Sequence, residues 1–467
     1  MKNKPLLVLL ISPLLFSISG CNKKGSKSIS ESSSSEEESS SSEEPFDYTP
    51  IDKEIEGCYN YFVKYTTNYT ENSPAFGLCR DRLTDLTTCS IAATGFLLGS
   101  YPVFVEQGLM DKDDAKYKAD KTLDTILSMQ NDTSVSYAGC LSHFVNINTA
   151  KRLGTSEIST IDTAILVSGA ITASQYFGGD LIEKANTIWS NVNFNRFVTT
   201  KNGKTHISMG VDDPEKRNQL SPWDYYAEQL MIYILGTGNP NHANRIDAKY
   251  YSNIAKKTGE LQGIKHIYSW YGSLFTYQYS HAFFNFRNYN DANGINWYEN
   301  SVNASKTNYL HCQQLSANYA SFSEESWGLT ACDTPLGYSG LLGCRPRGYD
   351  GNSIDYQRIQ GTIAPTAAIS SMPFTPDESY RALKFFQSLE KLNHEKLGLR
   401  DSFNLDFNGG GAWYDSDFIG IDKGIEVMQL YNFKVKDFVS NLAMQNPYVI
   451  EGFVNNGFVE VEDGIQR

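Results

Sequence analysis

The chain of 467 residues has a formal net charge of −13 at neutral pH, and 13% of its residues are aromatic. It has no basic patch of the kind that binds nucleic acid, and no apolar run beyond the N-terminal segment approaches transmembrane length. Composition therefore argues against nucleic acid as a partner and against membrane-spanning helices in the remainder of the chain.

The N-terminal segment, residues 1–21, has the pattern of a bacterial export signal. Two lysines precede an apolar run over 6–18, which is shorter than the roughly 20 residues needed to cross a bilayer. The run ends in Ser19-Gly20-Cys21, and small residues before a cysteine resemble the bacterial lipobox. This resemblance implies that Cys21 receives lipid and anchors the protein to the outer face of a bacterial membrane. The alternative is an ordinary secretory signal with an unrelated cysteine.

Residues 22–50 are rich in serine and glutamate, with SSSSEEESSSSEE near their centre. Such a composition buries too little apolar surface to offset its conformational entropy, and its like charges repel one another. We therefore predict a disordered tether over 22–50 and a folded domain over 51–467.

Seven cysteines follow Cys21, and an odd number cannot all pair within one chain. None has CxxC spacing, and the histidines show neither HxxxH nor HExxH. We therefore expect no metal or cofactor, and we interpret most of these cysteines as small buried residues.

Helix signals dominate the domain, because few segments alternate with a period of two. Nearly all-apolar stretches predict fully buried helices over 91–101, 161–177, 223–236, 362–372 and 419–431. Helices with one charged face are predicted over 113–129, 181–192, 246–261, 376–392 and 433–444. A sixth pair is predicted over 276–287 and 297–319.

Six alternations of a buried and an amphipathic helix predict an all-α fold, an (α/α)6 barrel. The apolar helices would form its inner ring, and long loops would form a cleft at one end. The alternatives are an open α-solenoid and a multi-layer helical domain, although no fixed repeat period supports a solenoid.

Carboxylates on the predicted inner helices are candidate site residues. Asp162 is either a first-turn acid of its helix or a cleft residue. Glu228 precedes an apolar run, and a buried glutamate must be paired or neutral, which is the state that a general acid needs. Asp415, Asp417 and Asp422 lie among aromatic residues, where they could act in catalysis, cap a helix or bind a cation.

Several motifs in chain order resemble the glycoamylase-like family, which includes bacterial β-1,2-glucanases. The resemblance runs from about residue 59 to residue 458. It rests on the following segments: Gly77-Leu78-Cys79-Arg80-Asp81-Arg82, 90–96, 161–164, 208–210, 223–228, 275–281, 327–333, 361–365 and 413–424. Two local departures are Cys79 in the first motif and Tyr226-Ala227, where relatives often have Tyr-Asn.

The resemblance implies an (α/α)6 barrel that hydrolyses β-glucan, most specifically β-1,2-glucan, with inversion. Inverting enzymes use two carboxyl groups roughly 6.5–9.5 Å apart, one donating a proton and one activating water. On matching positions, Glu228 is the general acid and Asp417 the base. The other residues implied at the site are Asp162, Asp415 and Asp422 as further acids, and Trp223, Tyr279, His281, Trp327 and Trp413 as sugar contacts.

Two other functions remain open at this point. A glycan-binding lipoprotein without catalysis would keep the same cleft. A polysaccharide lyase would use a Tyr or His base, such as Tyr279 or His281, but an acidic chain is poorly suited to the acidic polymers that lyases prefer.

Overall fold

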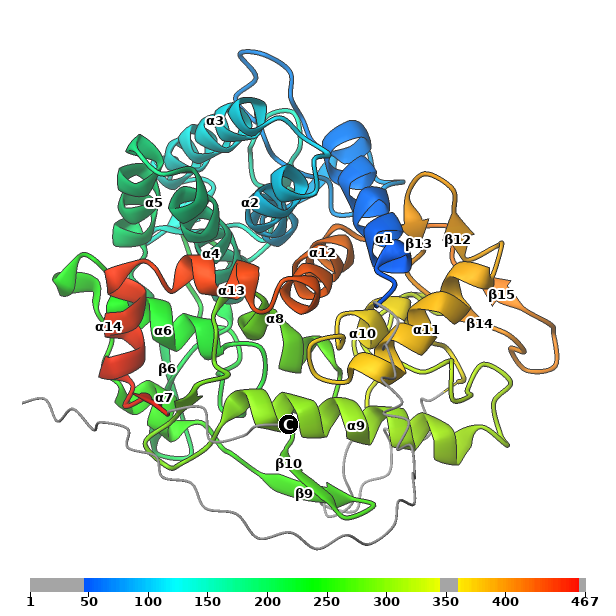
Figure 1. Cartoon of the computed structure of the whole chain (residues 1–467). Coiled ribbons are helices and arrows are strands. Elements are labelled where there is room, and N and C mark those ends of the chain that lie inside the picture. The colour runs from blue at the N-terminus through cyan, green and yellow to red at the C-terminus, as the bar shows by residue number, and fades with distance from the viewer. Residues whose placement is uncertain (1–45, 345–359, 462–467) are drawn as a thin grey trace, which may run out of the picture. The chain divides into compact units, whose positions relative to one another are not determined.

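The computed structural model describes residues 46–344 and 360–461, and helices make up most of its regular structure (Figure 1). The helices are α1 (Thr49–Tyr59), α2 (Ile91–Glu106), α3 (Lys112–Gln130), α4 (Thr160–Phe177), α5 (Asp180–Asn191), α6 (Leu230–Gly238), α7 (Lys249–Asn253), α8 (Phe275–Phe283), α9 (Trp297–Leu315), α10 (Pro365–Ile369), α11 (Pro376–Ser388), α12 (Gly420–Lys434), α13 (Phe438–Ala443) and α14 (Pro447–Asn455). A π-helix, Asn60–Thr66, continues α1. No helix in the described ranges is both long enough and apolar enough to cross a membrane.

The strands are short and pair two by two in antiparallel fashion. The pairs are β1 (Thr88–Ser90) with β4 (Phe144–Asn146), β2 (Ser136–Tyr137) with β3 (Cys140–Leu141), β5 (Ile158–Ser159) with β8 (Gly210–Val211), β6 (Val198–Lys201) with β7 (Lys204–Ile207), β9 (Thr258–Leu261) with β10 (Ile264–Ile267), β11 (Tyr289–Asn290) with β16 (Val459–Glu460), β12 (Asn393–His394) with β13 (Gly398–Leu399), and β14 (Phe403–Asn404) with β15 (Trp413–Tyr414). These strand pairs lie in the segments that connect the helices and hold those segments together by backbone hydrogen bonds.

The apolar helices pack on one another. Helix α2 packs against α4 and α12, α6 packs against α4, and α8 and α10 pack against α12. The helices α3, α5, α9 and α11 lie nearer the periphery of the ribbon (Figure 1). This arrangement agrees with the predicted division into buried and amphipathic helices.

Two glycines allow the close crossing of α2 and α4. A Cβ atom on Gly169 would lie 1.9 Å from the carbonyl oxygen of Gly95, and one on Gly95 would lie 2.6 Å from Leu166 Cα. Any larger side chain would separate the helices, so these glycines fix the position of the first turn of α4, which contains Asp162.

The structure corrects several predicted boundaries. The predicted helix over 246–261 is wrong: α7 covers only Lys249–Asn253, and 258–267 is a β-hairpin whose turn residues, Gln262 and Gly263, have positive φ. The apolar residues at the start of the hairpin also fit one face of a helix, which explains the wrong prediction. The predicted helix over 223–236 begins only at Leu230.

Other differences lie at the ends of the chain and of helices. Helix α1 begins at Thr49, so the last two residues assigned to the tether are helical. The helices α1 and α14 were not predicted, and α12 and α13 divide the 419–444 region at later residues than expected. The signal segment, Cys21 and most of the predicted tether lie outside the described residues. The seven other cysteines are buried, which confirms the interpretation of most of them as small buried residues, and none is paired.

Candidate active site

A cavity of about 600 Å³ opens between the N-terminal ends of α2, α4, α8 and α12 and their preceding loops. Four carboxyl groups, one guanidinium and one imidazole share its wall with apolar and aromatic side chains. The lining residues are Asp81, Arg82, Ala92, His143, Phe144, Ile161, Asp162, Ile165, Glu228, Phe275, Tyr279, Ala331, Tyr338, Ile419, Ile421 and Asp422. The predicted site residues Asp162, Glu228, Tyr279 and Asp422 thus meet in one cavity.

Glu228 lies just before α6, and its backbone is held by α8. The Ser280 hydroxyl donates to the Glu228 carbonyl oxygen at 2.6 Å and accepts from the Met231 N–H at 3.1 Å. Burial, with a smaller contribution from the nearby Asp162, raises the pKa of the Glu228 carboxyl to about 7. A carboxyl group that keeps its proton close to neutral pH is suited to general acid catalysis.

Asp162 occupies the first turn of α4, behind the N-cap Ser159. Its Oδ2 accepts a hydrogen bond from the Ser159 hydroxyl, and its Oδ1 lies 3.5 Å from His143 Nε2. Asp162 is therefore both a first-turn acid of its helix and a residue of the cavity wall, which were the two interpretations of the sequence.

Asp417 is buried beside the cavity rather than among its lining residues. Its carboxylate accepts hydrogen bonds from the Thr84 hydroxyl and from the backbone N–H groups of Thr84 and Phe418. Its Oδ2 lies 3.7 Å from Nη1 of Arg82, which does line the cavity. Donors thus surround Asp417, and Arg82 links it to the cavity wall.

Arg82 also binds a second acidic group. Its Nη1 donates to Asp333 Oδ2 at 2.8 Å, and its Nε lies 3.6 Å from Asp81. Oxygens of Asp333, Asp401 and Asp415 lie within 4.8 Å of one another and could ligate a cation. The guanidinium already supplies positive charge there.

Asp401 and Asp422 are buried carboxyl groups that influence each other's pKa. Burial raises the pKa of Asp401 to about 7, and burial together with Asp401 raises the pKa of Asp422 well above its usual range. Burial likewise raises the pKa of Asp415. A raised pKa favours the protonated form of these carboxyl groups, which cannot accept a proton from water.

The predicted aromatic residues divide into two groups. Tyr279 lines the cavity, with its ring centroid 5.2 Å from that of Phe275. Trp223 is 3% exposed, donates from its indole to the Thr160 hydroxyl, and packs on Trp270. Trp413 is half-buried in β15. Of these three, only Tyr279 reaches the cavity.

His281 and Trp327 do not line this cavity. His281 bonds with the Ser301 hydroxyl and packs on Phe286, in a separate small pocket behind α8. Trp327 is fully buried against Tyr309. Both are buried core residues that do not reach the cavity.

Four polar cavity residues, Asp81, Arg82, His143 and Tyr338, were not among the site residues named from the sequence. Asp81 and Arg82 belong to the quoted GL..DR motif, so the sequence did draw attention to that segment. His143 and Tyr338 lie in loops without a local pattern, although Tyr338, which is 61% exposed, is well placed to stack on a sugar.

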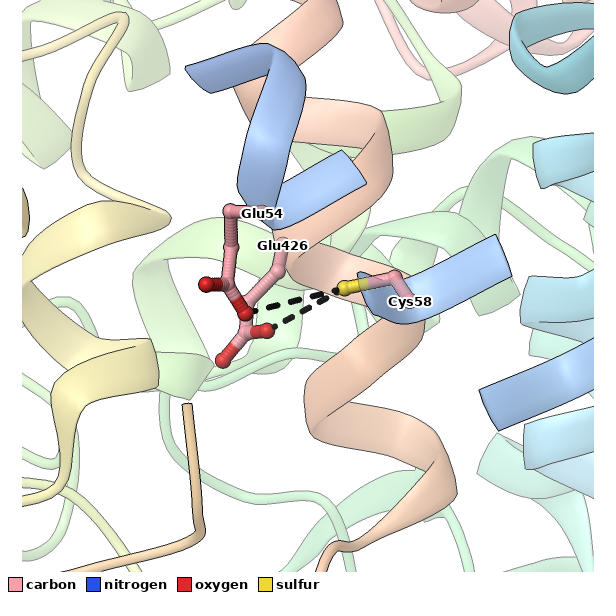
Figure 2. Close-up of side chains that lie close together, drawn as sticks. All are labelled: Glu54, Cys58 and Glu426. Carbon is pink, nitrogen blue, oxygen red and sulfur yellow. Dashed lines mark hydrogen bonds between the residues drawn. The ribbon is translucent and has the colours of Figure 1, made fainter. Parts of the chain in front are cut away.

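A second cluster, outside the cavity, also has the composition of a metal site. Glu54 and Cys58 of α1 face Glu426 of α12 in the core (Figure 2). The Cys58 thiol lies 3.4 Å from Glu426 Oε2, and the Lys423 ammonium lies 2.8 Å from both Glu54 Oε1 and Glu426 Oε2. Lys423 therefore already supplies the cation, and we interpret this buried charge cluster as structural.

Residues 221–447, which include Glu228, Tyr279, Asp417 and Asp422, match the glycoamylase family model, described as "Putative glucoamylase". The resemblance to the glycoamylase-like family is thereby confirmed. The chain is also similar to an exo β-1,2-glucooligosaccharide sophorohydrolase (non-reducing end) of Parabacteroides distasonis, with 24% identity over 419 residues. That match covers 81% of this chain and 54% of the relative, so this chain spans about half the length of the curated relative.

Solved structures share the fold. An endo-β-1,2-glucanase from Chitinophaga pinensis, in complex with sophorotriose and glucose, has a TM-score of 0.74 at 23% identity over 88% of this chain and 98% of its own. A β-1,2-glucanase from Parabacteroides distasonis has a TM-score of 0.74 at 21% identity over 87% and 60% of the two chains. The protein therefore shares the helix-rich fold of these solved structures.

Proposed function

We propose that the protein is a glycoside hydrolase that cleaves β-1,2-linked glucan. The observation that carries this proposal is the buried carboxyl group of Glu228, with its pKa raised to about 7, in an aromatic-lined cavity that contains further carboxyl groups. The named relatives, which act on β-1,2-glucan or its oligosaccharides, support the choice of linkage.

The proposal includes the arrangement of the helices. The inner ring of an (α/α)6 barrel would consist of α2, α4, α6, α8, α10 and α12, which are buried on nearly all sides. The cavity lies at the end where several of these helices begin, and a barrel would place the connecting loops around it.

In the proposed reaction, Glu228 donates its proton to the glycosidic oxygen as the bond to the anomeric carbon breaks. Asp417 removes a proton from a water molecule that attacks the opposite face of the sugar, and Arg82 keeps that carboxylate in place. A single displacement of this kind inverts the anomeric configuration. Tyr279, with the apolar lining, contacts the neutral sugar rings.

The two alternative functions are less well supported. A lyase base would have to be unprotonated, but burial raises the pKa of Tyr279 well above its usual range. Burial lowers the pKa of His281 to about 3, but the ring lies outside the cavity. A protein that only binds glycans would need no protonated glutamate beside further acids.

The substrate is tested by incubating the soluble domain with a panel of purified glucans and resolving the products by size. We expect short oligosaccharides from β-1,2-glucan and none from α-glucans. Cleavage of an α-glucan without cleavage of β-1,2-glucan would contradict the substrate assignment. Binding to β-1,2-glucan without any release of reducing ends would favour the glycan-binding alternative.

We also propose that lipid on Cys21 holds the enzyme at the outer face of a bacterial membrane, where a polymer can be cut before import. Cys21→Ala should then appear in the soluble fraction or remain unprocessed, because the lipid is the anchor. Membrane fractionation with immunodetection measures this, and Cys58→Ala, which alters a cysteine of the folded domain, is the control. A Cys21→Ala protein that is cleaved normally and still resists a high-salt wash would contradict the anchor.

A further inference from the structure

His143 lies on one wall of the cavity with an acidic partner at each ring nitrogen. Its Nδ1 is 2.9 Å from Glu157 Oε1, and its Nε2 is 3.5 Å from Asp162 Oδ1. The ring also stacks on Phe144, with the centroids 3.7 Å apart. Because both nitrogens and one face are engaged, the imidazole has one defined orientation.

Hydrogen bonds also fix the position of the backbone around His143. Its N–H donates to the Glu157 carbonyl oxygen at 2.9 Å, and its carbonyl accepts from the N–H of Ile91, the first residue of α2. The pair of β1 and β4 fixes the next residues. His143 therefore joins α2, the Glu157 loop and the first turn of α4 at the edge of the cavity.

The imidazole is positively charged at neutral pH. Burial opposes the charge, but Asp162 and Glu157, with Asp81, raise the pKa of His143 to about 9. The other charged groups on this side are Arg82, 3.6 Å from Asp81, and Arg152, which is near Glu157. The three acids outweigh these two cations, so the net field favours the protonated ring.

We propose that His143 is a positioning residue of the cavity, whose imidazolium holds the Asp162 carboxylate as the acceptor for a hydroxyl group of a bound glucose unit beside Glu228. This inference rests on the proposed function. A carboxylate offers about four acceptor positions, and Asp162 uses one for the Ser159 hydroxyl and turns another toward His143. Acceptor positions on Asp162 therefore remain for a sugar hydroxyl. The aromatic residues of the cavity wall, Phe144 and Tyr279, would contact the sugar ring.

The test measures binding of a β-1,2-linked glucotriose, sophorotriose, by calorimetry as a function of pH. Glu228→Gln is the background, because it prevents turnover and removes the titration of Glu228. In this background we expect binding to weaken as pH rises through about 9, where His143 loses its proton. Adding His143→Gln should weaken binding at neutral pH by at least about tenfold, as for loss of a hydrogen bond to a charged group, and abolish this transition.

Two further variants complete the series. Adding Asp162→Asn should move the transition down toward the ordinary histidine value of 6.5, because Asp162 is the largest cause that raises the His143 pKa. Adding His394→Gln, the same change on the β12–β13 hairpin, should leave the profile unchanged. A pH profile that is the same with and without His143, or a transition that Asp162→Asn does not move, would contradict the proposal.

An NMR titration of the histidine rings separates this inference from the proposed function, since it needs no ligand. The signal that His143→Gln removes should titrate near 9 in the otherwise unchanged protein and lower in Asp162→Asn. Titration near 6.5 in both would overturn the charged pair even if glucan is hydrolysed. A high value in a protein that neither binds nor cleaves β-1,2-glucan would support the pair and contradict the proposed function.

Discussion

Glu228→Gln should lower turnover of β-1,2-glucan by at least about a hundredfold, the lower range of general acid–base catalysis. The amide has the shape of the carboxyl group but no proton to donate to the leaving oxygen. The variant should fold normally, because the backbone contacts with Ser280 do not involve the side chain. Steady-state release of reducing ends measures the loss, and Glu395→Gln on the exposed β12–β13 turn is the matched control.

The same reaction predicts a comparable loss for Asp417→Asn, with the oligosaccharide affinity largely kept. Thr84 and Arg82 hold the group in place but cannot replace its basicity. Asp422→Asn is the informative comparison, because Asp422 lines the cavity and its pKa is raised well above its usual range by burial and by Asp401. If Asp422→Asn abolishes turnover and Asp417→Asn does not, the role of base belongs to Asp422 and the proposed assignment is wrong.

The alkaline limit of activity follows from the same carboxyl group. The pKa of Glu228, raised to about 7, means that the acid loses its proton as pH rises through that value. The ratio kcat/KM should therefore fall above about 7. Asp162 contributes to the raised pKa of Glu228. Asp162→Asn should therefore move the alkaline fall in kcat/KM to lower pH, whatever the effect of the substitution on sugar binding.

Lys423→Met should lower the free energy of unfolding by about 3–5 kcal/mol, as when one partner of a buried ion pair is removed. Lys423 is 1% exposed and its ammonium lies between Glu54 and Glu426. Figure 2 shows these two glutamates, which are also buried, close together. Without the ammonium, two carboxyl groups and a thiol face one another in the core. Chemical denaturation measures the loss, and Lys265→Met, which removes an exposed ion pair, should change stability little.

The loss from Lys423→Met should also grow as pH rises. Burial already raises the pKa of Glu426 to about 7, above the value of about 4.5 in an unfolded chain. The folded state then holds more protons than the unfolded state, so stability falls as pH rises through this interval. Adding Glu426→Gln should recover part of the loss. No recovery, or a loss no larger than that of Lys265→Met, would contradict the electrostatic account.

The sequence predicted the buried helices well because their hydrophobicity is nearly continuous. The stretches 91–101 and 161–177 correspond to α2 and α4. Continuous hydrophobicity says little about where a helix begins, however, and the segment 223–229 proved to be irregular. The hairpin over 258–267 was missed because its apolar residues also fit a helical face.

The site prediction was limited in the same way, because the sequence does not show which side chains tertiary packing brings to the cavity. Asp162 and Glu228 were found because a carboxylate on an apolar helix needs an explanation, and both line the cavity. His281 and Trp327 lie in motifs just as prominent, but the side on which a side chain leaves its loop depends on tertiary packing. His143 gave no signal, since its importance comes from partners on two other segments.

Proton NMR during the first minutes of β-1,2-glucan digestion tests the central claim most directly. Hydrolysis with Glu228 as acid and Asp417 as base predicts that the new reducing ends appear first as the α anomer and then equilibrate with the β anomer. An initial β anomer would mean retention through a nucleophilic carboxylate and would contradict the role of Asp417. No new reducing ends at all would contradict the hydrolysis of β-1,2-glucan itself.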